Sequence, residues 1–186
     1  MVGLSGLWMP VVLSAVAVFI ASSIIHMVIG WHRGEYQGVP NEEAIGNALR
    51  PFNLQPGEYQ MPWTNDMKAM GTPEFQARIK AGPNLTMIVR PNAMWSMGKM
   101  LGQWFVYCLV VSVFVAYITG RAMGQGVDYM HVFRLVGATA FVSYSLALWQ
   151  FYVWFGKSLR YMLTSTLDGL IYGLVTAGVF GWLWPR

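Results

Sequence analysis

The chain has few charged residues, and this scarcity excludes an ordinary soluble domain. Aspartate, glutamate, lysine and arginine make up 11% of its 186 residues, whereas 55% of the residues are hydrophobic. Globular domains contain roughly 25% charged residues. The composition therefore predicts an integral membrane protein, and it excludes a disordered or collagen-like chain.

Cysteine and the common catalytic motifs are also scarce. The single cysteine, Cys108, has no partner for an internal disulfide. The sequence lacks the patterns HExxH, ExxH, CxxC, GxSxG and GxxxxGK[ST], which are typical of metalloproteases, di-iron proteins, thiol-redox proteins, serine hydrolases and P-loop proteins. We therefore favour a protein that is not an enzyme, and we expect no catalytic residue, no cofactor and no metal ion.

Four apolar runs are long enough to cross a membrane as helices, which needs about 20 residues. They cover residues 7–30, 100–119, 132–155 and 167–184. The predicted fold class is therefore all-α integral membrane with four transmembrane helices. The first run has no basic segment before it and is longer than the apolar part of a signal peptide, so we interpret it as a membrane anchor.

The basic residues predict how these helices are oriented. Seven lie in residues 31–99, and Lys157 and Arg160 lie between the third and fourth runs, whereas Arg121 and Arg186 flank the opposite helix ends. Because basic residues are retained on the cytoplasmic side, residues 31–99 are predicted to be cytoplasmic and both termini outside. The net charge of +4 thus indicates topology and anionic lipid rather than nucleic acid.

Lys157 and Arg160 are also candidates for contacts with lipid headgroups. An aromatic run at residues 149–155 precedes them. This run fits either an aromatic belt at the membrane interface or a groove for a quinone, pigment or sterol, and we favour the belt.

Residues 31–99 predict a small mixed polar insertion between the first two helices. PNEEAIGNALRP is typical of a short helix capped by Asn41, and TPEFQARIKAGP of a second helix capped by Thr72. Residues 58–61 and 85–89 are typical of short strands. The predicted organisation is a first transmembrane helix in residues 1–30, the insertion in 31–99 and a three-helix region in 100–186.

Small residues recur at every fourth position of the last apolar run. They are Gly169, Gly173, Ala177 and Gly181, which together form one smooth stripe on a helix. Such a stripe permits close approach of two helix backbones in a membrane. It is either an interface with a partner or a second copy, or a contact inside the chain's own bundle, and we favour the second interpretation.

Asp168 is the other candidate in this run, because acids within membrane spans are costly and often functional. It is a candidate ion or proton site. However, Asp168 follows Ser165 by three residues at the expected start of the fourth helix, a spacing typical of a helix cap. We favour the cap.

The three histidines do not predict a paired site. His26 and His32 lie near one end of the expected bundle and His131 near the other. On a continuous helix, a spacing of six residues places His26 and His32 about 120° apart. The remaining alternative is that a single histidine, His26, ligates a haem or pigment.

Two segments resemble a group of small bacterial inner-membrane proteins that have no assigned activity. They are PNEEAIGNALRPFNLQPGEYQMPW in the insertion and STLDGLIYGLVTAGVFGWLWP near the carboxyl terminus. The group has one helix, a polar insertion and three further helices. The resemblance therefore implies a multi-pass protein of the bacterial inner membrane, and it implies no catalytic residue or cofactor.

The sequence favours an accessory or assembly subunit of a membrane complex, or a small homo-oligomer, in contact with membrane lipids and without a nucleic-acid partner. The small-residue stripe and the lack of catalytic motifs support this hypothesis. One alternative is a small transporter or channel, which needs a polar route near mid-membrane. Another is a membrane enzyme or a redox or pigment carrier that uses His32 with the acids of the insertion.

Overall fold

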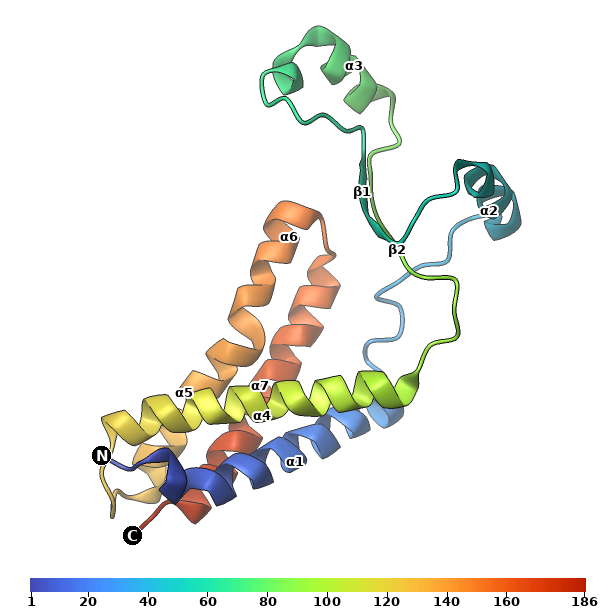
Figure 1. Cartoon of the computed structure of the whole chain (residues 1–186). Helices are drawn as coiled ribbons and strands as arrows, with labels where there is room; N and C mark the ends of the chain where they lie inside the picture. Colours follow the sequence, from blue (N-terminus) through green and yellow to red (C-terminus); the bar gives the residue numbers. More distant parts are fainter. The chain divides into compact units, whose positions relative to one another are not determined.

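The computed structural model describes all 186 residues, and the chain divides into two units. The first unit combines Met1–Gln37 with Ser96–Arg186, and the second is Gly38–Trp95. The first unit contains four helices that are long and apolar enough to cross a membrane (Figure 1). The predicted mostly helical, multi-pass membrane fold is confirmed at this level.

Each of the first two membrane-spanning segments is helical along its whole length. Helix α1 (Trp8–Ile24) follows a 3-10 turn (Leu4–Leu7) and continues into a π-helical turn (Ile25–Ile29). Helix α4 (Met97–Ala122) begins after Ser96, whose hydroxyl accepts a hydrogen bond from the amide of Lys99.

The third span is not one regular helix. Helix α5 (Tyr129–Ser145) passes through a 3-10 turn (Leu146–Leu148) into the short helix α6 (Trp149–Phe155). The side chain of Asp128 caps α5 by accepting from the amide of His131.

The fourth span, α7 (Leu159–Leu183), starts eight residues before the predicted start at residue 167. Ser158 caps it by accepting from the amide of Tyr161. Ser165 and Asp168, whose spacing suggested a helix start, lie inside the helix. The neighbouring threonines 164 and 166 fit into it because their hydroxyls donate to carbonyls one turn earlier.

The four long helices form a closed arrangement in which each packs against two others. Helix α1 contacts α4 and α7, and α5 also contacts α4 and α7. The core between them is filled by large apolar side chains: Leu7, Val18, Val115, Val136 and Phe180. Both chain termini lie at the same end of this bundle (Figure 1), where the amide of Val2 donates to the carbonyl of Gly120 at 2.7 Å and that of Gly126 to Pro185 at 3.0 Å.

The second unit contains short elements around a two-stranded sheet. Its helices are α2 (Glu42–Leu49) and α3 (Pro73–Ala81), and strands β1 (Gly57–Met61) and β2 (Leu85–Val89) pair antiparallel. Asn41 and Thr72 cap the two helices as the sequence predicts. Phe75 is the only hydrophobic residue that is buried in this unit, so its core is very small.

Candidate functional site

The candidate site forms where the chain reverses direction after the first span. The π-helical turn ends at Ile29, and Gly30 adopts a left-handed conformation with φ of 66°. The amide of Gly30 donates to the carbonyl of Ile25 and ends the helix. The amide of Arg33 then donates to the carbonyl of Gly30 and forms a turn. Residues 31–36, which we call the strap, consequently bring their side chains onto α7.

His32 in the strap bridges two carboxylates. Its Nδ1 lies 2.6 Å from Oε1 of Glu35, and its Nε2 lies 2.8 Å from Oδ2 of Asp168 on α7. The Nε1–H of Trp31 donates to Oδ1 of Asp168 and to Nε2 of His32, each at 3.0 Å. Asp168 is buried, so these contacts replace the water that an exposed carboxylate would bind.

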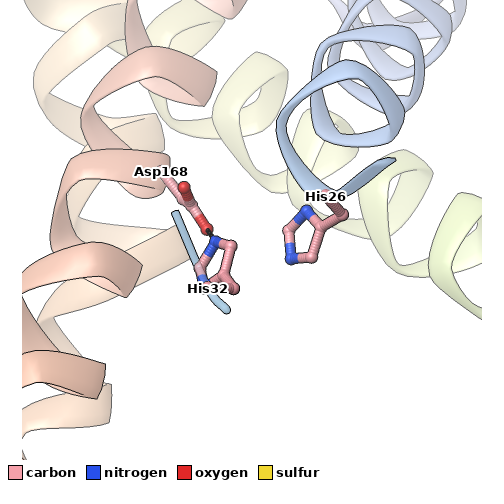
Figure 2. A group of neighbouring side chains, drawn as sticks. All are labelled: His26, His32 and Asp168. Atoms are coloured by element: carbon pink, nitrogen blue, oxygen red, sulfur yellow. Dashed lines mark ion pairs between the residues drawn. The ribbon is translucent and has the colours of Figure 1, made fainter. Parts of the chain in front are cut away.

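His26 approaches the same point from the end of the first span. Its ring stacks on that of His32 with centroids 4.4 Å apart and an interplanar angle of 13°. Its Nδ1 donates to the carbonyl of Ser22 at 2.9 Å. One ligand atom each from His26, His32 and Asp168 lies within 4.8 Å of the others, and Figure 2 shows these three side chains, which we call the His–Asp cluster.

Two predictions about these residues are wrong. Asp168 does not cap α7, because the helix begins nine residues earlier at Leu159 and Asp168 lies inside it. His26 and His32 are not separated around one helix, because the helix ends at Ile29 and the left-handed Gly30 turns His32 back toward His26. A glycine directly after the apolar run is a common helix-end signal and could have revealed this turn.

The two basic residues predicted to contact lipid headgroups hold the strap. The guanidinium of Arg160 donates to the carbonyl of Arg33 at 2.9 Å, and Nζ of Lys157 donates to the hydroxyl of Tyr36 at 3.2 Å. The hydroxyl of Thr164 also donates to the carboxylate of Glu35. The strap is therefore attached to the first turns of α7 at several points.

The small-residue stripe of α7 faces α5 of the same chain. A Cβ atom on Gly169 would lie 2.5 Å from Cβ of Ser145, and one on Gly173 would lie 3.1 Å from the carbonyl oxygen of Gly137. Ala177 also packs on Gly137, and a Cβ on Gly181 would lie 2.7 Å from the ring of Tyr129. Since α5 covers the stripe, the stripe contributes to packing within the bundle.

Polar groups deeper in the bundle are mostly paired locally. The hydroxyls of Ser14 and Ser112 bond to each other at 3.0 Å across α1 and α4. Thr119 and Thr176 donate to carbonyls of their own helices. Two buried tyrosine hydroxyls have no hydrogen-bond partner; they belong to Tyr144 and Tyr172.

His131 provides a contrast to the His–Asp cluster. Its Nδ1 lies 3.2 Å from Oδ2 of Asp128, but both side chains are largely exposed and belong to one helix end. No third ligand joins this pair. An imidazole is thus paired with carboxylates at two histidines, His32 and His131, and only His32 lies beside another histidine.

No protein-family model matches the chain, and neither a curated protein nor a solved structure matches it.

Proposed function

We propose that this multi-pass membrane protein binds a divalent transition-metal ion through His26, His32 and Asp168. The convergence of these three side chains from three segments of the chain carries the proposal. Two imidazoles and one carboxylate suit zinc and neighbouring first-row metals. Many metal sites that retain an open coordination position use histidine nitrogens and a carboxylate oxygen as ligands.

The contact between His32 and Asp168 supports a cation at this point. In the tautomer whose Nδ1–H donates to Glu35, the neutral ring of His32 has its one lone pair on Nε2, and that lone pair is available to an ion when Nε1–H of Trp31 is directed to Oδ1 of Asp168. Nε2 lies 2.8 Å from the other carboxylate oxygen of Asp168. Two electron-rich atoms at this distance need a proton or a metal ion beside them, and adjacent ligands of one zinc ion lie about 3 Å apart.

Each proposed ligand is also oriented through its other polar atom. Ser22 holds Nδ1 of His26, Glu35 holds Nδ1 of His32, and Trp31 holds Oδ1 of Asp168. Such outer partners fix the ring orientation and raise the basicity of metal ligands. Since the two rings are nearly parallel, the His26 ring would have to turn about its Cβ–Cγ bond to share an ion with His32, and this turn would break its hydrogen bond to the carbonyl of Ser22.

Titration of the full-length protein with Co²⁺ tests this function. Protein without a polyhistidine tag is purified in mild detergent, and the cobalt absorption bands are recorded before and after addition of Zn²⁺. We expect one ion for each chain and displacement of cobalt by zinc. The variants His32→Ala and Asp168→Asn should lower the affinity at least about 10-fold, because each removes a metal ligand.

The matched control is His131→Ala, which removes the histidine of the exposed pair with Asp128. This variant should bind cobalt as the unmodified protein does. Equal binding by His32→Ala, or an equal loss in His131→Ala, would contradict the proposal. In that case the contacts of His32 form an ion pair between an imidazolium and two carboxylates.

The topology and location stay proposals based on the sequence. Seven basic residues in the insertion and the two at residues 157 and 160 support a cytoplasmic insertion with both termini outside. The resemblance to small bacterial proteins supports the inner membrane. An accessory role in a membrane complex is less well supported by the structure than by the sequence, because α5 covers the small-residue stripe that suggested a partner.

A further inference from the structure

Two buried carboxylates flank His32, and no lysine or arginine forms an ion pair with them. The side chains of Glu35 and Asp168 are only 6% and 8% exposed. His32 is the ion-pair partner of both, and neither carboxylate has another. Two negative charges therefore share one imidazole at a place where uncompensated charge is unfavourable.

The basic residues near the strap have other partners. The guanidinium of Arg160 donates to the carbonyl of Arg33, and Nζ of Lys157 donates to the hydroxyl of Tyr36 and lies over its ring. Both hydrogen bonds are exposed to solvent. Because water and salt screen exposed charges, these cations compensate the buried carboxylates only weakly.

The two carboxylates lie on opposite sides of the His32 ring. Asp168 lies 2.8 Å from Nε2, so it would share a bound ion with that nitrogen. Glu35 accepts a hydrogen bond of 2.6 Å from Nδ1–H and another from the hydroxyl of Thr164. Glu35 is therefore bonded to protein groups behind the ring and would not touch the ion. Its charge would act on the ion across the imidazole.

A divalent ion balances the charge of this site. The neutral forms of His26 and His32 add no charge, so the charge comes from the two carboxylates. A divalent ion makes the assembly neutral, whereas a monovalent ion leaves one negative charge buried. Burial favours the neutral assembly.

We infer that the charge of Glu35 sets the preference of the site for divalent over monovalent metal ions, an inference that rests on the proposed function. By Coulomb's law, Glu35 attracts a divalent ion at Nε2 of His32 twice as strongly as a monovalent ion at the same place. Loss of this charge should therefore lower the two affinities by different factors. Loss of a role in orienting His32 should lower both by the same factor.

Competition between Co²⁺ and Ag⁺ in the full-length protein tests this inference. All variants carry Cys108→Ser, which removes the free thiol. Protein without a polyhistidine tag is studied in mild detergent and chloride-free buffer. The loss of the cobalt absorption bands is recorded against the free Ag⁺ concentration, which a silver electrode measures. Both ions displace any proton from Nε2 of His32, so competition with that proton cancels from the ratio of the two affinities.

Glu35→Gln should lower the affinity for Co²⁺ about 100-fold and that for Ag⁺ about 10-fold, because the Coulomb energy lost scales with the charge of the ion. The preference for Co²⁺ should thus fall about 10-fold. Glu35→Ala removes the same charge and should shift the preference equally, even if the amide of Gln alters the strap. Glu35→Asp retains the charge and should retain the preference.

Thr164→Val is the matched control, because it removes the other hydrogen-bond donor to Glu35 and leaves both carboxylates charged. It should leave the preference between the two ions unchanged. A shift equal to that of Glu35→Gln would contradict the electrostatic role.

The outcomes separate the two proposals. If Glu35→Gln lowers both affinities equally, Glu35 only orients His32; if neither affinity changes, its charge has no effect on the ion. Either result overturns the inference and leaves the metal site standing. If the protein with Glu35 intact binds no cobalt, the proposed function itself fails.

Discussion

The two parts of α7 make different kinds of contact. Residues 169–181 approach α5 through small side chains, so closely that a Cβ on Gly169 would lie 2.5 Å from Cβ of Ser145. Residues 159–168 instead contact the strap through polar side chains, including the 2.8 Å contact between Asp168 and His32. One helix therefore combines a region of backbone packing with a region of polar contacts.

This difference separates the contacts that hold the helices together from the contacts that form the proposed metal site. In a membrane, close van der Waals packing of small residues suffices to associate two helices. Burial of a carboxylate is unfavourable unless it is paired and hydrogen-bonded. The polar contacts around Asp168 exceed what packing requires, and this excess supports the proposed metal site.

The largest expected effect is on the packed part of α7. Gly169→Ala places a methyl group against Ser145, so we expect it to lower the stability by about 1–3 kcal/mol, the usual range for overpacking. Thermal unfolding in detergent, followed by circular dichroism, measures this change. Gly178→Ala is the matched control, because its nearest neighbour, the hydroxyl of Tyr129, would be 4.0 Å away. Equal stability of the two variants would remove the distinction between the stripe and the rest of the helix.

A smaller effect on stability is expected in the polar part of α7, residues 159–168. Asp168→Leu removes the carboxylate that accepts from Nε1–H of the partly buried Trp31, and we expect a loss of about 0.5–1.5 kcal/mol, the usual contribution of a hydrogen bond. Asp168→Asn retains an oxygen for Trp31 and can donate to His32, so its stability without metal should stay close to that of the unmodified protein. The same unfolding assay, run in EDTA, compares the two. If Leu were tolerated as well as Asn, the polar contacts would not stabilise α7.

The smallest effect is expected at the exposed pair outside the spans. Hydrogen bonding from the amide of His131 lowers the pKa of Asp128 below its usual value. A carboxyl with a lowered pKa stabilises the folded protein above its ordinary pKa and loses this contribution as the pH falls through the folded value. Asp128→Asn should therefore reduce the fall in melting temperature between pH 5 and pH 3 only slightly. A large reduction would show that Asp128 contributes more than a helix cap.

Apolar runs and helix caps made much of the fold predictable. The four spans follow from hydrophobic length, and Asn41 and Thr72 mark helix starts through local hydrogen bonds that depend on neighbouring residues only. The predicted start of α7 at residue 167 is wrong because the segment before it, which includes Thr164 and Thr166, is less apolar than the rest of the span and is nevertheless helical. The hydroxyls of these threonines can bond within a helix, and hydropathy does not register such bonds.

The candidate site was less accessible to sequence reasoning. The predicted separation of His26 and His32 by about 120° requires one continuous helix through both, whereas Gly30 ends the helix between them. The pairing with Asp168 joins residues 136 positions apart along the chain, counted from His32. No local pattern encodes such a contact, because it depends on how α7 packs beside the end of the first span.

The three side chains of the cluster differ in their access to the surroundings: His26 is exposed, His32 is partly buried and Asp168 is buried. For the proposed metal site, this gradient implies an order of binding in time. An arriving ion would meet His26 first, then His32, and Asp168 last. Release would follow the reverse sequence, so the innermost bond would govern its rate.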